Sequence, residues 1–247
     1  MNAAALFGKH VWIDTVELIR LPMYSVSTMV FPTLLYLLFG LPYGHSETAS
    51  RLIMSSFCAY AVIGVTLFQF GVGIATDRNS PWEQYLRVLP VNALTRLGAQ
   101  ITAALFFAAA SVGTVIAAAA IFSHAAPNAE LLVRLVPVLL LGSIPFALLG
   151  ISIGYWAGRR SALPIANLIY LPMALGGGLW MPPEALPRAI ALLSPYLPSR
   201  HYGEIAWAVA RGVTTPAISW LWLLGYALVF GCTAVLGYRR DESRNYR

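Results

Sequence analysis

The histidines and cysteines of this chain are the side chains that could bind a metal ion or act as nucleophiles. They are His10, His45, His124, His201, Cys58 and Cys232. The histidines are far apart in the sequence, and both cysteines lie within apolar runs. Zinc sites and disulfide frameworks instead show ligands or cysteines at short, regular spacings. We therefore expect no metal site, no disulfide framework and no hydrolytic dyad.

The sequence also lacks the residues for ATP hydrolysis by a P-loop mechanism. The pattern G-x-x-x-x-G-K-[ST] does not occur, and the only lysine is Lys9. That mechanism needs a glycine-rich loop around the phosphates and a lysine that reaches them. We expect the chain to hold no cofactor and to have no ATPase activity of its own.

The composition predicts an all-α membrane protein that forms a single domain over residues 1–247. Hydrophobic residues make up 58% of the chain and charged residues 11%, whereas soluble proteins average about 25% charged residues. Several apolar runs are long enough to cross a bilayer as helices. Six spans are predicted: Pro22–Gly40, Leu52–Ala75, Leu97–Phe122, Leu131–Trp156, Ser161–Met181 and Ala217–Tyr238.

The charged residues predict the orientation of these spans. Nearly all of them lie outside the spans or at their ends, which disfavours an ion pump or voltage sensor. With the N-terminus in the cytoplasm, the inner side carries Lys9, Arg20, Arg78, Arg87, Arg96, Arg159, Arg160, Arg239, Arg240, Arg244 and Arg247, and the outer side carries Arg51, Arg134, Arg188, Arg200 and Arg211. This asymmetry follows the positive-inside rule. It predicts a multi-pass protein of the cell (inner) membrane with both termini in the cytoplasm.

The loop 77–96, between spans two and three, contains a short polar helix. Ser80 and Glu83 form an S-x-x-E capping box, and Pro81 suits the first helical position. Its apolar side carries Trp82, Tyr85, Leu86 and Leu89, and its polar side carries Glu83, Gln84 and Arg87. The residues alone allow two interpretations: a helix resting on lipid headgroups, or a rigid docking element for a soluble partner.

The first 21 residues are predicted to form an amphipathic interfacial helix. Trp12, Val16, Ile19 and Met23 line one side at helical spacing, and Lys9, Glu17 and Arg20 share another. Such a helix lies in the membrane surface. A plain start to a long tilted span is the alternative, although Pro22 favours a break.

The segment 182–216, between spans five and six, is too rich in proline and charge to cross the bilayer. It contains two short amphipathic pieces separated by Pro195 and Pro198. We expect a re-entrant helical hairpin on the outer side, because irregular backbone at membrane depth must be covered by protein or water. His201 is expected to help fix the hairpin through a hydrogen bond.

Within the predicted spans, only a few polar or bulky residues could line a path across the membrane. The candidates are Gln69 in span two and Asn167 and Tyr170 in span five, next to the glycines at 176–178. Polar side chains in spans often bond neighbouring helices instead of a substrate. The scarcity of charge inside the membrane favours a hydrophobic or amphipathic cargo.

The chain resembles the membrane subunit of a type 2 ATP-binding-cassette (ABC) transporter. The run Ile74–Pro90, IATDRNSPWEQYLRVLP, is similar to the family pattern I-A-x-[DE]-[RL]-x-x-[GS]-x-x-[DE]-x-[LF]-x-x-[LT]-P, and the spacing of Pro195, His201 and Glu204 is similar to the segment before the last span. Pro81 departs from the family, in which many members carry Gly or Thr. The resemblance covers the whole chain.

The resemblance implies a role for each segment. The helix between spans two and three would be a coupling helix in a groove of a separate ATPase subunit, contacting it through Ser80, Trp82, Glu83, Gln84, Tyr85 and Arg87. The N-terminal helix, with Lys9, Trp12, Glu17 and Arg20, would brace this contact. ATP and Mg would bind the partner.

The resemblance also implies the assembly and the activity. Two ATPase subunits and a second permease, identical or related, would complete an exporter. Its cargo would be a drug, antibiotic, peptide or lipid-like molecule. A polysaccharide or lipid-linked glycan permease, or a channel or transporter outside the ABC class, remains the alternative.

Overall fold

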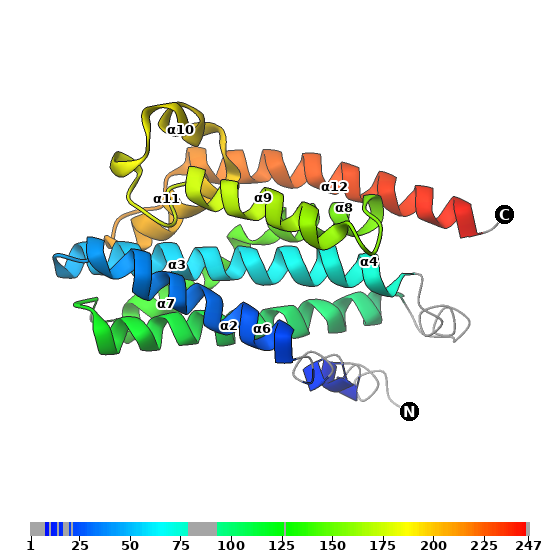
Figure 1. Ribbon diagram of the computed structural model, residues 1–247, viewed down its shortest axis with the longest axis horizontal. Coiled ribbons are helices and arrows are strands. Elements are labelled where there is room, and N and C mark those ends of the chain that lie inside the picture. The colour runs from blue at the N-terminus through cyan, green and yellow to red at the C-terminus, as the bar shows by residue number, and fades with distance from the viewer. Residues whose placement is uncertain are drawn as a thin grey trace.

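The computed structural model describes residues 8–9, 11–13, 15–16, 20, 22–78, 93–125 and 127–245. Within these ranges the regular secondary structure is helical throughout, with no strand. The helices form an elongated bundle in which successive long helices run back and forth along one axis (Figure 1). The prediction of an all-α protein is confirmed.

The first half of the bundle contains two helices interrupted by π-helical turns. Its elements are α2 (Pro22–Leu35), the π-helix η1 (Tyr36–Gly40), the 3-10 helix η2 (Leu41–Tyr43), α3 (Glu47–Phe68), the π-helix η3 (Gln69–Gly73) and α4 (Ile74–Asp77). Ser46 starts α3, because its hydroxyl accepts a hydrogen bond from the Ala49 amide at 3.2 Å, which satisfies one of the free N–H groups of the first turn. The predicted second span is therefore one continuous helical rod from α3 to α4.

The third and fourth predicted spans form three helices. These are α6 (Ala93–Phe122), α7 (Ala129–Gly142) and α8 (Ile144–Trp156). The side chain of Asn128 caps α7 by accepting a hydrogen bond from the Leu131 amide at 2.9 Å. Pro145 near the start of α8 lacks an amide proton, so a short break at Ser143 separates α7 from α8.

The last part of the chain places short helices between two long ones. Its elements are α9 (Ala162–Gly176), the 3-10 helix η4 (Pro183–Ala185), α10 (Arg188–Leu193), the 3-10 helix η5 (Ser194–Tyr196), α11 (Pro198–Ala210) and α12 (Ala217–Asn245). Pro198 occupies the first turn of α11 instead of breaking it. At the end of α9 the chain turns at Gly178, where φ is +75°, a conformation that glycine adopts without steric cost.

Among the residues that the structure describes, four helical stretches are long and apolar enough to cross a membrane. They are Glu47–Asp77, Gly98–Phe122, Ala129–Trp156 and Ala217–Ser243. Thr28–Tyr43 and Ala162–Gly176 are apolar helices of shorter length. The chain is therefore a multi-pass membrane protein by composition and helix length, while crossing of the membrane by the two shorter helices, and hence six spans, stays a prediction.

The bundle has two distinct ends, which we name by the elements found there. The α4 end contains α4, the start of α6, the α8–α9 turn and the end of α12 (Figure 1). The α11 end contains α10, α11 and the connections before α3 and α7. Arg78, Arg159, Arg160, Arg239 and Arg240 are at the α4 end, as the predicted orientation requires of one membrane face.

The core of the bundle lies along α3. This helix packs against α2, α6, α8 and α11, and most of its side chains are fully buried. In contrast, α12 leaves an apolar face uncovered, which includes Leu221, Leu224 and Leu228. A continuous apolar face of this kind contacts lipid or another protein chain.

Candidate functional site

The pathway candidate Tyr170 lies in an aromatic cluster between α3 and α9. Its ring stacks on that of Tyr60 with centroids 4.6 Å apart, and its hydroxyl donates to the Tyr60 carbonyl oxygen at 2.9 Å. Phe68 contacts the same ring edge to face at 5.3 Å. Tyr170 is 3% exposed, so within this chain its role is to join the two helices.

Gln69 and Asn167, the other two pathway candidates, differ in exposure. Gln69 is buried at the first position of the π-helix η3, against which α9 packs. Asn167 lies one turn before Tyr170 and is partly exposed, and its amide donates to the Leu163 carbonyl of its own helix at 3.1 Å. Gln69 and Tyr170 are thus brought to the same helix contact, whereas Asn167 lies toward the open face of α9.

The residues predicted for the outer hairpin meet at α11 and the start of α12. Glu204 accepts hydrogen bonds from Arg200 at 2.9 Å and from Ser219 at 2.8 Å, one on each carboxylate oxygen. Because the Ser219 proton points to Glu204, the Ser219 oxygen can accept from His201 Nδ1, 3.4 Å away. This links three residues of α11 to α12, while the role of His201 in fixing an outer hairpin stays a prediction.

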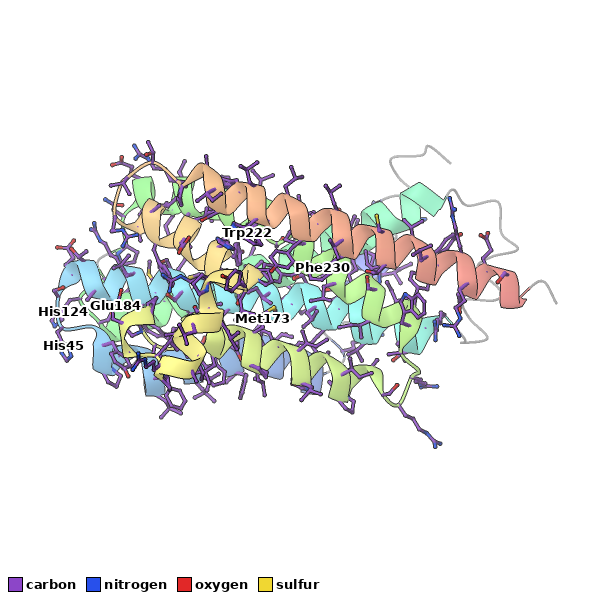
Figure 2. The ribbon with its side chains drawn as sticks, turned by 90° about the horizontal axis from the view of Figure 1, so that it is seen from above. His45, His124, Met173, Glu184, Trp222 and Phe230 are labelled. Carbon is purple, nitrogen blue, oxygen red and sulfur yellow. The ribbon has the colours of Figure 1, made fainter. Side chains whose placement is uncertain are left out.

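Pro195 and an aromatic wall complete this region. Pro195 lies in η5, immediately before α11. The His201 ring stacks on Trp222 of α12 at 5.1 Å; Trp222, labelled in Figure 2, is 38% exposed. Tyr226 of the same helix donates its hydroxyl proton to the Tyr196 carbonyl. The contacts hold η5 and α11 against α12.

The surroundings shift the acid–base equilibria of this cluster. Burial alone would raise the pKa of Glu204, but the hydrogen bonds from Arg200 and Ser219 and the charge of Arg200 bring it below the ordinary value. Burial lowers the pKa of His201, although the charge of Glu204 opposes this effect. The favoured state at neutral pH therefore has an ionised Glu204 and a neutral His201.

The two hairpin helices differ strongly in burial. Eleven of the thirteen residues of α11 are buried, by α3, α7, α9 and α12, whereas α10 has none. Tyr202 shows the depth: its hydroxyl donates to the Leu139 carbonyl of α7 at 2.7 Å. Of the two helices of the expected hairpin, α11 is therefore covered by the rest of the protein and α10 is not.

A cavity of about 500 Å³ opens beside α11, between the start of α3 and the 178–184 connection. Its apolar wall includes Leu52, Ile53 and Trp207, and its charged residues are Glu184, Arg200, Glu204 and Arg211. The Trp207 indole donates to Ser56 of α3 at 2.5 Å, and the Arg200 guanidinium lies over the same ring at 5.3 Å. The cavity can therefore hold a molecule that is partly apolar and partly charged.

Two histidines and Glu184 lie at the same end of the bundle without forming a ligand set. Figure 2 shows His45, His124 and Glu184 at the α11 end. Among the residues that the structure describes, no group of three or more potential ligands could hold a metal ion.

The predicted coupling residues Ser80, Trp82, Glu83, Gln84, Tyr85 and Arg87 lie outside the described residues, as does Glu17. Lys9, Trp12 and Arg20 are described as helical and exposed. Trp12 is 70% exposed, as expected for a side chain at a membrane surface. The interfacial and coupling helices stay predictions.

Sequence reasoning missed two features next to the candidate residues. One is the π-helix η3, for which no sequence pattern is known to us; only the glycines at 71 and 73 could have drawn attention to it. The other is Arg78 at the end of α4, whose ion-pair partner Asp241 is far away in the sequence. Such long-range pairs have no local signal.

The comparisons with known proteins bear on the function of this bundle. A family model described as ABC-2 type transporter matches residues 7–210. The chain belongs to the ABC-2 type transporter family. The predicted resemblance is thereby confirmed, and membership in this family implies partnership with an ABC ATPase subunit.

A curated relative agrees with this assignment to the ABC-2 family. The chain is 27% identical over 190 residues to "Putative transport permease YvfS" of Bacillus subtilis (strain 168). The alignment covers 77% of this chain and 78% of the relative. The comparison with solved structures finds no significant match.

Proposed function

We propose that this ABC-2 protein is the permease subunit of an exporter for hydrophobic or amphipathic molecules, with ATP and Mg bound by a separate ATPase subunit. The observation that carries the proposal is the family match over residues 7–210. The absence of a P-loop pattern from the sequence supports the assignment of ATP hydrolysis to another polypeptide.

We place the α4 end in the cytoplasm. The arginines gathered there, including Arg159, Arg160 and Arg239, support this orientation through the positive-inside rule. The ends of the predicted coupling loop 77–96 that the structure describes, Arg78 after α4 and Ala93 at the start of α6, are both at that end. In this orientation the ATPase subunit contacts residues 79–92 and the N-terminal helix, and both termini are cytoplasmic.

The cavity beside α11 supports an amphipathic cargo. Its volume of about 500 Å³ is within the range of about 300–1,000 Å³ that is usual for small-molecule sites. Trp207 and Ile53 offer apolar contact, and Arg211 and Glu184 offer charge at the edge. We assign this cavity to the outer side, where cargo would leave toward the outer leaflet.

A second permease would complete the pathway. The exposed apolar side chains Leu163 and Leu168 of α9 lie on either side of Asn167, so this face of α9 is uncovered in a single chain. We propose that another copy, or a related permease, covers it and that the two chains enclose the transport path.

Reconstitution tests the proposed activity. The chain would be co-expressed with its partner ABC ATPase subunit, purified as a complex, and placed in liposomes with an amphipathic fluorescent dye as the probe. We expect dye movement that requires ATP and Mg and stops when the Walker B acidic residue of the ATPase is replaced. Equal movement with the chain alone would contradict the proposal, since a channel needs no ATPase.

The coupling segment can be tested in the same system. Replacing Ser80 and Glu83 with Ala removes the predicted capping box, so we expect reduced dye transport at unchanged membrane insertion. Reversing the charge with Arg87→Glu should weaken binding of the ATPase subunit. If both variants transport dye and bind the ATPase subunit as the wild type does, the alternative interpretation is favoured, in which this helix rests on lipid headgroups.

A further inference from the structure

Arg78 is the last described residue before segment 79–92, and its side chain joins three helix ends. Its Nη1 atom donates to the Tyr155 carbonyl oxygen at 2.5 Å and its Nη2 atom to the Ala157 carbonyl oxygen at 3.0 Å. Nη1 also lies 3.3 Å from the Asp241 carboxylate of α12. The two charged side chains are only 14% and 16% exposed.

The chemistry of these contacts is that of a helix cap supplied from outside the helix. The last carbonyl groups of α8 have no partner within the helix, and they carry its negative partial charge. A guanidinium fork can bond two carbonyls and a carboxylate together, which an ammonium group cannot do in the same planar geometry. Arg78 therefore holds the ends of α4, α8 and α12 at fixed spacing.

Close packing above Arg78 prevents α8 from sliding against the α3–α4 rod. A Cβ atom at Gly154 would lie 2.9 Å from the Phe70 carbonyl oxygen, and one at Gly150 would lie 3.0 Å from the Leu67 carbonyl oxygen. The spacing of these two glycines, G-x-x-x-G, lets helix backbones approach closely. The helices therefore meet backbone to backbone along η3.

Side-chain bonds connect α8 to α12 just as firmly. Ser152 donates to the Phe230 carbonyl at 2.9 Å, and the Trp156 indole donates to the Thr233 carbonyl at 2.9 Å. Arg240 of α12 lies over the Trp156 ring at 5.1 Å. At the α4 end of the bundle, these contacts thus join four elements into one unit: η3, α4, α8 and α12.

The other end of segment 79–92 continues into α6 (Ala93–Phe122), which is not among the helices that the Arg78 side chain bonds. The helix that follows, α6, packs mainly on α3 and α2. Ser111 of α6 donates to the Thr28 carbonyl of α2 at 2.6 Å. The segment therefore links the unit held by Arg78 to the α2–α6 pair.

We propose that Arg78 is a positioning residue for energy coupling: it transmits displacement of segment 79–92 to α8 and α12 through the Tyr155 and Ala157 carbonyls and Asp241. This inference rests on the proposed function, because the displacement would come from the ATPase subunit. Without the contacts of the Arg78 guanidinium, segment 79–92 could move without displacing the ends of α8 and α12.

The test measures whether α12 moves with nucleotide. Spin labels would be attached to the native, exposed Cys232 of α12 and to a cysteine replacing Leu105, an exposed residue of α6; Cys58 is buried and stays unlabelled. Labelled chains diluted with unlabelled ones would be assembled with the ATPase in nanodiscs. The distance distribution would be compared without nucleotide and with ATP and vanadate.

The variants separate the contacts of Arg78. Arg78→Gln removes all of them, and Asp241→Asn removes the ion pair alone. Glu242→Gln is the matched control, because it neutralises an exposed neighbouring carboxylate. We expect a nucleotide-dependent shift in the wild type and in Glu242→Gln, loss of most of it in Arg78→Gln, and partial loss in Asp241→Asn, at unchanged assembly with the ATPase.

The possible results distinguish the inference from the proposed function. A full shift in Arg78→Gln overturns the inference alone. If Arg78→Gln does not assemble, Asp241→Asn decides the question, and a shift equal to that of Glu242→Gln overturns the inference. No nucleotide-dependent shift in the wild-type complex overturns the inference and contradicts the proposed coupling to ATP as well.

Discussion

The hydroxyl oxygen of Tyr170 fills the space that a side chain at Gly64 would need. A Cβ atom at Gly64 would lie 2.6 Å from that oxygen. The same hydroxyl donates to the Tyr60 carbonyl at 2.9 Å. Glycine at position 64 is therefore what allows the ring of α9 to reach the backbone of α3.

Gly64→Ala should destabilise the protein because it displaces the Tyr170 hydroxyl from its acceptor. Overpacking of a filled core costs about 1–3 kcal/mol, so we expect a lower melting temperature in detergent. Unfolding can be followed with a thiol-reactive dye, since Cys58 is buried and the exposed Cys232 can be replaced by Ser. A double variant Gly64→Ala with Tyr170→Phe should lose less stability than the sum of the two, because the clashing oxygen is absent. Strict additivity would contradict this packing.

Gly154→Ala should destabilise the contact between α8 and η3. The new methyl group would meet the Phe70 carbonyl oxygen at 2.9 Å and the Ile74 side chain at 2.7 Å, and neither can move without shifting a helix. Gly225→Ala in α12 is the control, since nothing lies within 4 Å of the added atom. We expect a lower melting temperature for the first variant and little change for the second. Equal effects would show that helix propensity, and not close packing, determines both.

Trp207→Phe should weaken the joint between α11 and α3. The replacement keeps an aromatic ring but removes the indole N–H that donates to Ser56 at 2.5 Å. Loss of such a bond costs about 0.5–1.5 kcal/mol. If cargo contacts the cavity, the same variant should also change the concentration dependence of dye transport. A wild-type melting temperature would mean that the bond contributes nothing measurable.

Acidification should destabilise the hydrogen-bonded cluster of α11. The pKa of His201 lies below its ordinary value of 6.5, so as the pH falls through that value the unfolded chain binds the proton first and stability decreases. The pKa of Glu204 lies below its ordinary value of 4.5, so its stabilising contribution is present above that value and is lost as the pH falls through the lower folded-state value.

The two contributions can be separated by melting temperatures measured as a function of pH. His201→Gln should lose the part of the decrease that begins near pH 6.5, and Glu204→Gln should lose the part that begins near pH 4.5. Identical pH profiles in the wild type and both variants would contradict these shifts.

The sequence predicted the α-helical class, the positions of the long apolar helices and the family. These properties depend on local patterns: runs of apolar residues, caps such as Asn128 of α7, and prolines that begin or end helices. The break between α10 and α11 near Pro195 was predicted for the same reason. The sequence predicted a re-entrant hairpin but not which helices would cover it, and the residues of α11 are buried nearly all round because neighbouring helices cover even its polar side.

Only the tertiary structure decided which polar residues meet. His201 and Glu204 are close in sequence, but Ser219, which joins them, comes from another helix. The pairing of Arg78 with Asp241 connects residues more than half the chain apart. The need for glycine at position 64 became visible only from the position of the Tyr170 hydroxyl. Local spacing determines which face a side chain occupies on its own helix, whereas the partner it finds depends on how the helices pack.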